Sequence, residues 1–224
     1  MRVFLQRNYW VADYHYLTPF YSPCISKGCV PESAEFGRFL PDVWFLPFAA
    51  LTLPFLLLFR MTCYYYRKAY YRAFFLDPPA CAVAESRKSY RGETAFPFVL
   101  QNLHRFFLYL AVLFLGFLWY DAIRAFRFDG RFGVGVGSLV LTGNIVLLTL
   151  YTLSCHSVRY MAGGAVDCFS CSAAGRARHG LWRALTGLNE RHMLFAWLSL
   201  VGVGLTDLYV RELACGAIRD LRLF

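Results

Sequence analysis

Charged residues are scarce in this chain. They make up 17% of its 224 residues, whereas soluble domains carry about 25%. Hydrophobic residues reach 58%, aromatic residues reach 19%, and the mean hydropathy is +0.42. Because a soluble domain of this size would be less apolar, the composition indicates an integral membrane protein.

The first residues do not have the features of a signal peptide. Residues 1–10 place Arg2 and Arg7 around a very short apolar stretch, without a long apolar region or a small-residue cleavage site. Insertion is therefore expected to depend on internal segments. The net charge of +9 would suit nucleic acid, but the basic residues flank apolar runs instead of forming a stripe. That pattern is typical of membrane topology, so no nucleic-acid partner is predicted.

Four apolar segments approach the length that a membrane helix needs. A bilayer core of roughly 30 Å takes about 20 mostly apolar residues. The predicted fold class is therefore all-α: an integral membrane helical bundle with four transmembrane helices. The first of these helices is expected to continue past Tyr66. The four segments are residues 43–61, 103–125, 134–155 and 193–210.

The connections between these segments predict the orientation. Two of them are rich in Lys and Arg, and the positive-inside rule assigns such loops to the cytoplasm. Residues 1–42 are then an extracytoplasmic segment, and residues 43–210 form the bundle, with cytoplasmic loops at 67–102 and 159–191. Residues 211–224 form a C-terminal tail. The N-terminus is predicted outside the bacterial cell membrane.

This topology gathers cysteines and histidines at the cytoplasmic face. Thiolate and neutral imidazole are natural ligands of zinc, haem iron and iron–sulfur clusters. Singly, a buried cysteine behaves as a small hydrophobic residue. As a set, drawn from only eight cysteines and five histidines, these residues indicate a metal or electron-transfer site. The six are Cys63, Cys81, His104, Cys155, His156 and His192.

Two kinds of metal centre fit these residues. Haem b needs two axial histidines, which His104 with His156 or His192 would supply, but haem leaves the three cysteines unexplained. A cluster bound by two Cys and two His, the Rieske arrangement, uses both residue types. The soluble Rieske pattern of Cys-x-His and Cys-x-x-His is absent. The residues alone leave the choice open.

The remaining cysteines predict different chemistry. Cys24 and Cys29 lie in the predicted outer segment, where oxidising conditions permit a disulfide. Cys168 and Cys171 form a C-x-x-C with only His179 nearby. Without a second pair this is a weak metal signal, and free thiols are expected there.

Polar side chains inside the apolar segments are usually functional or paired. Asn144, Asp121 and Asp207 are such residues. Hydrogen bonds that tether helices are expected for the two aspartates, and an outer proton path is the less favoured alternative.

Tyrosines and basic residues alternate in residues 63–75, beyond the first apolar segment. This composition suits the membrane interface, and it also offers a platform for a soluble partner. A Tyr or Arg side chain here is suited to bonding a quinone carbonyl. The quinone-binding candidates are Tyr66, Arg67, Tyr70 and Arg105.

Several segments resemble one family over nearly the whole chain. They are TCYYYRKAYYR at 62–72, PPACAV at 78–83, YRGET at 90–94, QNLHR at 101–105, YHYLTPFYSPC at 14–24, CHS at 155–157 and LNERHM at 188–193. The chain resembles the membrane-anchor subunit of actinobacterial-type succinate dehydrogenase, of the mycobacterial Sdh1 type.

The resemblance implies a specific role. In that family the subunit anchors a flavoprotein and an iron–sulfur subunit to the cytoplasmic face and forms a menaquinone site. It also carries a membrane-embedded Rieske-type [2Fe–2S] cluster near that site, without haem. Four of the six Cys and His residues are expected to be ligands, with Cys63 and Cys81 as the preferred thiolates. The subunit alone is expected to have no activity on succinate.

Two departures from the family pattern matter. Relatives commonly carry further Cys and His where this chain has Val158 and Tyr160, so those positions are not expected to be essential ligands. Relatives also tend to have one more apolar helix before residue 14, which leaves a choice between four and five transmembrane helices. Two other functions stay open: a haem b anchor of a succinate dehydrogenase or fumarate reductase, and a non-redox structural or transport subunit.

Overall fold

The computed structural model describes residues 8–41, 49–63, 65–66, 94, 96, 98–128, 130–164 and 166–224. The chain divides into two compact units. Unit one comprises Met1–Pro54 and Val112–Phe224, and unit two comprises Phe55–Ala111. The helices α1 (Ala49–Met61) and α3 (His104–Arg124) contribute residues to both units.

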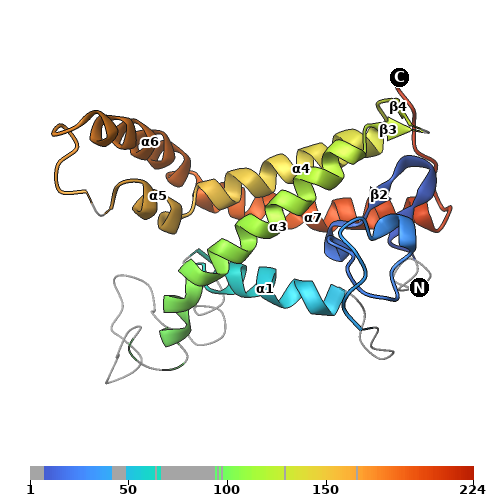
Figure 1. Ribbon diagram of the computed structural model, residues 1–224, viewed down its shortest axis with the longest axis horizontal. Coiled ribbons are helices and arrows are strands. Elements are labelled where there is room, and N and C mark those ends of the chain that lie inside the picture. Colours follow the sequence, from blue (N-terminus) through green and yellow to red (C-terminus); the bar gives the residue numbers. More distant parts are fainter. Residues whose placement is uncertain are drawn as a thin grey trace, which may run out of the picture. The chain divides into compact units, whose positions relative to one another are not determined.

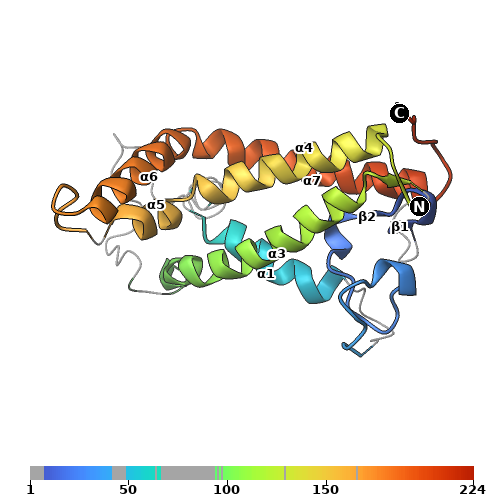
Figure 2. The same ribbon diagram turned by 45° about the horizontal axis from the view of Figure 1, so that its top comes forward.

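Two long apolar helices form the centre of unit one. α4 (Val136–Leu153) and α7 (His192–Ala214) lie side by side in both views (Figures 1 and 2). Small or β-branched residues recur every three or four positions along the buried face of α7, at Ala196, Ser199, Val203 and Thr206. This spacing places them on one side of a helix and lets its neighbour approach closely.

Among the described residues, three stretches are long and apolar enough to cross a membrane: Val99–Arg124, Val136–Leu153 and His192–Ala214. They correspond to the second, third and fourth segments predicted from the sequence, and they confirm a helical membrane protein. The last helix runs to Ala214 instead of the predicted 210. Of the first predicted segment, residues 43–48 lie outside the described residues, and the rest forms α1.

The end of α1 differs from the prediction. α1 ends at Met61 and is followed by a turn at Thr62 and a bend at Cys63, so the predicted helix is interrupted there. Residues 65–66 are helical again, and residues 67–93 lie outside the described residues. The Thr62 hydroxyl donates to the carbonyl of Leu58 at 2.7 Å, and the Cys63 amide donates to the carbonyl of Arg60 at 3.0 Å. These bonds satisfy carbonyls of the last turn, which is how a helix can stop inside an apolar stretch.

The connection predicted as the loop 159–191 contains two helices, α5 (His156–Gly163) and α6 (Ala173–Asn189), which pack on each other (Figure 1). The Arg159 guanidinium lies 4.6 Å from the centre of the Trp182 ring, and its Nε donates to Thr186 at 2.9 Å. A Cβ on Gly163 would lie 2.6 Å from the Trp182 ring, so glycine permits the close packing. Both helices are amphipathic and not apolar, which is why hydropathy alone did not reveal them.

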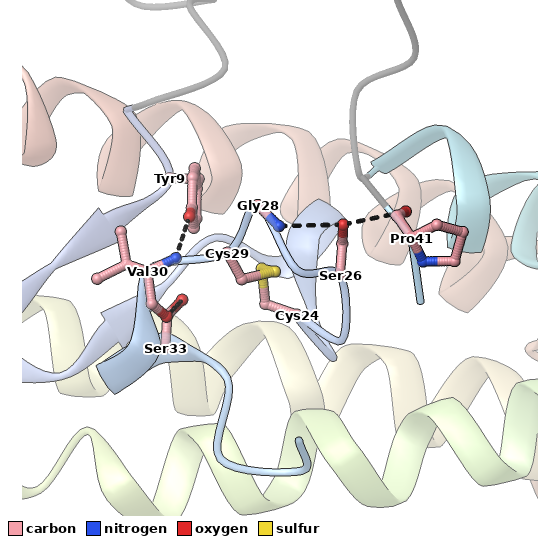
Figure 3. The surroundings of a disulfide bond; sticks show 8 residues. All are labelled: Tyr9, Cys24, Ser26, Gly28, Cys29, Val30, Ser33 and Pro41. Atoms are coloured by element: carbon pink, nitrogen blue, oxygen red, sulfur yellow. Dashed lines mark hydrogen bonds between the residues drawn. A yellow bond between two sulfur atoms is a disulfide. The ribbon is translucent and has the colours of Figure 1, made fainter. Parts of the chain in front are cut away.

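The N-terminal segment is held by a short hairpin and a disulfide. β1 (Trp10–Val11) pairs antiparallel with β2 (Tyr16–Leu17), and the 3₁₀ helix η2 (Ala12–Tyr14) connects them. Two more short 3₁₀ helices come after the hairpin, η3 (Pro19–Tyr21) and η4 (Pro31–Ser33). The disulfide joins Cys24 to Cys29, as the sequence permitted, and both cysteines are buried (Figure 3). The Tyr9 hydroxyl accepts from the Val30 amide at 2.8 Å beside it.

Asp220 binds the C-terminal tail to the rest of unit one. Its carboxylate accepts from the hydroxyls of Tyr16 and Tyr209, each at 2.7 Å, and from the amide of Gly137 at 3.0 Å. Gly137 is in the first turn of α4, where a carboxylate is favourable to the helix dipole. Burial raises the pKa of the Tyr16 phenol, so Tyr16 stays a donor. The adjoining hairpin pairs β3 (Arg127–Phe128) with β4 (Arg131–Phe132).

We expect Asp220→Ala to destabilise the protein by about 2–3 kcal/mol, because three donors lose their acceptor. The thermal unfolding midpoint of the purified complex measures the effect, with the exposed Asp13→Ala as a control that should change little. Equal midpoints for the two variants would show that the Asp220 contacts contribute nothing.

Candidate metal centre

Unit two places one histidine against the turn that ends α1. The Nδ1 atom of His104, the first residue of α3, lies 2.9 Å from the Thr62 hydroxyl. The imidazole stacks on Phe59 with ring centres 4.7 Å apart and planes 7° from parallel. Cys63, next in the chain to Thr62, is 2% exposed. A buried thiol and an oriented imidazole therefore belong to the same turn region. We call Phe59, Thr62, Cys63 and His104 half-site A.

Unit one contains a matching arrangement at the junction of α4, α5 and α7. The Nδ1 atom of His192 lies 2.6 Å from the Ser154 hydroxyl, and its ring stacks on Tyr151 with centres 5.1 Å apart. Cys155 follows Ser154 and is 1% exposed. The Asn189 side chain donates to the Ser154 carbonyl at 2.7 Å and fixes the junction. We call Tyr151, Ser154, Cys155 and His192 half-site B.

The hydroxyl contacts are compatible with a proton on Nδ1 of each imidazole. A hydroxyl has a single hydrogen to donate, and a backbone carbonyl lies within hydrogen-bond distance of each hydroxyl, Leu58 at 2.7 Å from Thr62 and Tyr151 at 3.0 Å from Ser154. When the hydroxyl donates to that carbonyl, it can accept from Nδ1–H, and the ring then carries its lone pair on Nε2. A histidine whose one nitrogen donates to a fixed neighbour is the form in which proteins present imidazole to a metal.

The two half-sites share a local sequence pattern. Residues 59–63 read FRMTC and residues 151–155 read YTLSC, so each has an aromatic, two variable positions, a hydroxyl residue and a cysteine. In each half-site the histidine begins the next membrane-spanning helix along the chain. Sequence reasoning identified the cysteines and histidines but missed Thr62, Ser154, Phe59 and Tyr151. The repeated five-residue pattern is the feature of the sequence from which these four residues could have been predicted.

His156 occupies a different position from His192. It begins α5, and its ring centre lies 6.5 Å from that of His192 with planes 67° apart. Burial, followed by the charge of Arg159, holds the pKa of His156 below its ordinary value. The neutral form, which alone can bind a metal, is therefore favoured. His156 is more exposed than His192, which is 2% exposed.

The predicted quinone-binding candidates divide between described and undescribed positions. Tyr66 is buried, and its hydroxyl accepts from the Arg60 guanidinium at 2.6 Å. Arg105 is exposed, and its Nε donates to the Tyr109 hydroxyl at 3.1 Å. Arg67, Tyr70 and the ligand candidate Cys81 lie outside the described residues.

Within either unit, the part of the chain that the structure describes contains no group of three His, Cys, Asp or Glu side chains able to hold a metal ion. Each half-site supplies one thiol and one imidazole. Thiol and imidazole are the two donor types of a Rieske-type centre.

Other predicted residues have structural roles. The expectation of free thiols at Cys168 and Cys171 is wrong, because the two form a disulfide with Cα atoms 5.7 Å apart, a separation that suits the bond. Asp121 of α3 accepts from Ser22 of the N-terminal segment, as a tether should. Asp207 pairs instead with Arg211 one turn later on the same helix.

Helices that are long and apolar enough to span a bilayer define a membrane-embedded helical protein. The chain belongs to the family of actinobacterial succinate dehydrogenase subunit SdhC, which it matches over residues 1–216. It is therefore a subunit of succinate dehydrogenase, and the other subunits of that enzyme are its partners.

One solved structure resembles the chain closely. It is described as the Mycobacterium smegmatis Sdh1 complex in the apo form, and its matching chain is 54% identical with a TM-score of 0.91. The match covers 100% of this chain and 84% of that one. No curated protein sequence matches the chain.

Proposed function

We propose that this subunit anchors a succinate:menaquinone oxidoreductase, forms its quinone site and passes electrons to menaquinone through a Rieske-type [2Fe–2S] cluster. A flavoprotein and an iron–sulfur subunit would oxidise succinate and deliver the electrons, and the anchor alone would not act on succinate. The observation that supports the proposal is that each unit holds a buried thiol in the same short turn region as an oriented imidazole, because thiolate and imidazole are the two donor types of a Rieske cluster.

Cys63, His104, Cys155 and His192 are the proposed ligands. Cys63, Cys155 and His192 are each 2% exposed or less. Cys24 and Cys29 are equally buried, but a disulfide joins them and leaves neither as a thiol. His104 joins them because its Nδ1 bond repeats that of His192. His156 and Cys81 are the reserve candidates. The cluster, when bound, supplies one-electron chemistry; the protein orients the imidazoles and keeps the thiols away from water.

The quinone site is proposed beside half-site A. The Tyr66 hydroxyl accepts from the Arg60 guanidinium at 2.6 Å, and phenol and guanidinium groups are donors of the kind that a quinone carbonyl accepts. Arg105, next to His104, adds a guanidinium, and Arg67 and Tyr70 remain candidates. We place this end of the bundle at the cytoplasmic face, since the loops 67–102 and 159–191 are basic.

Iron analysis and EPR spectroscopy of the purified, dithionite-reduced complex test the proposal. We expect a [2Fe–2S] signal, and two iron atoms per complex, beyond those of the iron–sulfur subunit. A haem b band in the reduced-minus-oxidised optical spectrum without that signal would favour the cytochrome reading. If both signals are absent from a complex that still reduces quinone, this subunit contains neither a cluster nor a haem, and the proposal is wrong.

A further inference from the structure

A groove of about 350 Å³ runs along the seam between α4 and α7, within unit one. This size falls in the range of roughly 300–1,000 Å³ that small-molecule sites occupy. Its lining is mainly apolar. It consists of Val140, Gly143, Asn144 and Leu147 from α4 and Gly202, Leu205, Thr206 and Tyr209 from α7.

Asn144 is the unusual member of this lining. It lies midway along α4 and is 4% exposed, yet its Oδ1 atom has no hydrogen-bond partner among the described residues. A buried amide oxygen without a partner costs roughly 1–3 kcal/mol, and polar groups in membrane spans usually mark functional sites. An occupant of the groove that bonds this amide would remove the cost.

The chemistry of an amide narrows the choice of occupant. Asn carries both an acceptor and a donor, and rotation about its last torsion, which is broad, exchanges the two. The side chain can therefore donate to a carbonyl and accept from a hydroxyl. A lipid acyl chain offers neither group, whereas a quinone offers the carbonyl and the corresponding quinol offers the hydroxyl.

The shape of the groove suits a flat ring. A Cβ on Gly143 would meet nothing within 4 Å, so the backbone beside Asn144 is open to an occupant. On the facing helix, a Cβ on Gly202 would meet only Leu147, at 3.1 Å. The Tyr209 ring forms part of the wall. Gly143 therefore leaves open space beside Asn144 for a ring, whereas the Leu147 side chain already fills the space at Gly202.

We propose that this groove is a second quinone-class site, in which Asn144 bonds the oxygen of a ring lipid. The proposal rests on the proposed function, in that the complex exchanges quinone with the bilayer. Asn144 precedes Leu153, the end of α4 next to half-site B, by nine positions or roughly 14 Å along the helix. The groove is thus a site of its own, where quinone or quinol waits in the membrane.

A photoreactive azido-naphthoquinone with an isoprenoid tail tests the site in the purified complex in nanodiscs. We expect labelled peptides from α4 and α7, competed by unmodified menaquinone. Asn144→Leu should lower that labelling about fivefold through the lost hydrogen bond. Gly143→Leu should lower it about tenfold by filling the groove. Gly116→Leu on α3 is the matched control, because a Cβ there also meets nothing within 4 Å.

Three results would overturn the site. Labelling that Asn144→Leu leaves unchanged would mean that the ring does not bond the amide. Equal competition by a plain fatty acid would mean that the groove holds an acyl chain. A crosslink between α4 helices of two copies would mean that a second copy covers it. A missing cluster signal with intact labelling would instead refute only the proposed function.

Discussion

Cys63→Ser and Cys155→Ser are each expected to abolish the [2Fe–2S] signal assigned to this subunit and to lower quinone reduction at least about tenfold. Each removes a buried thiolate that serine cannot replace, since a hydroxyl is a poor ligand for iron–sulfur clusters. EPR spectra and iron content measure the first effect, and succinate-dependent menaquinone reduction measures the second.

Two controls accompany these variants. Cys215→Ser changes a half-buried cysteine at the end of α7, whose thiol donates to the Glu212 carbonyl at 3.4 Å, and should leave the signal intact. Succinate oxidation with a soluble dye should survive in all three variants, because the proposal assigns that step to the partner subunits. An intact signal in Cys155→Ser would exclude half-site B and return Cys81 to the ligand set.

Arg211→Met is expected to destabilise the protein by about 3–5 kcal/mol, the largest stability effect that we predict. Arg211 and Asp207 are 6% and 5% exposed and form an ion pair within α7. The guanidinium also lies 5.1 Å from the centre of the Tyr21 ring. Removal of the arginine leaves a buried carboxylate without its counter-charge. The thermal unfolding midpoint of the complex measures the loss.

The double variant Asp207→Leu, Arg211→Met separates charge from packing. Because it removes both ions, most of the lost stability should return. Arg219→Met, at an exposed position, is the control and should change little. A double variant as unstable as Arg211→Met would show that the arginine acts through its contact with Tyr21 instead.

The sequence predicted the apolar helices well and their connections poorly. Runs such as those of α3 and α7 are long and almost free of charge, so hydropathy and bilayer thickness suffice to find them. α6 escaped because Ala, Gly and Arg dominate it and its apolar positions lie on one face only. The thiols of Cys168 and Cys171 were misjudged because spacing alone does not show whether two cysteines face each other.

The sequence predicted the candidate cysteines and histidines but not the residues that contact them. Cys63, His104, Cys155 and His192 are unusual residues at the ends of apolar runs, so the sequence alone singles them out. Thr62 and Ser154 are ordinary residues in a membrane helix, and only the hydrogen bonds to Nδ1 reveal their role. The sequence identified Asn144 as an unusual residue in an apolar segment. It could not predict the groove beside Asn144, because residues of both α4 and α7 line that groove.

The bond between Tyr16 and Asp220 has a consequence for the number of membrane crossings. The two side chains meet at 2.7 Å, so both lie on the same side of the bilayer. A chain that starts and finishes on one side must cross an even number of times between those points. Among the described residues, three candidate spans lie between Tyr16 and Asp220, and three is odd. These three spans alone would therefore leave Tyr16 and Asp220 on opposite sides, so we expect a further crossing between the two residues.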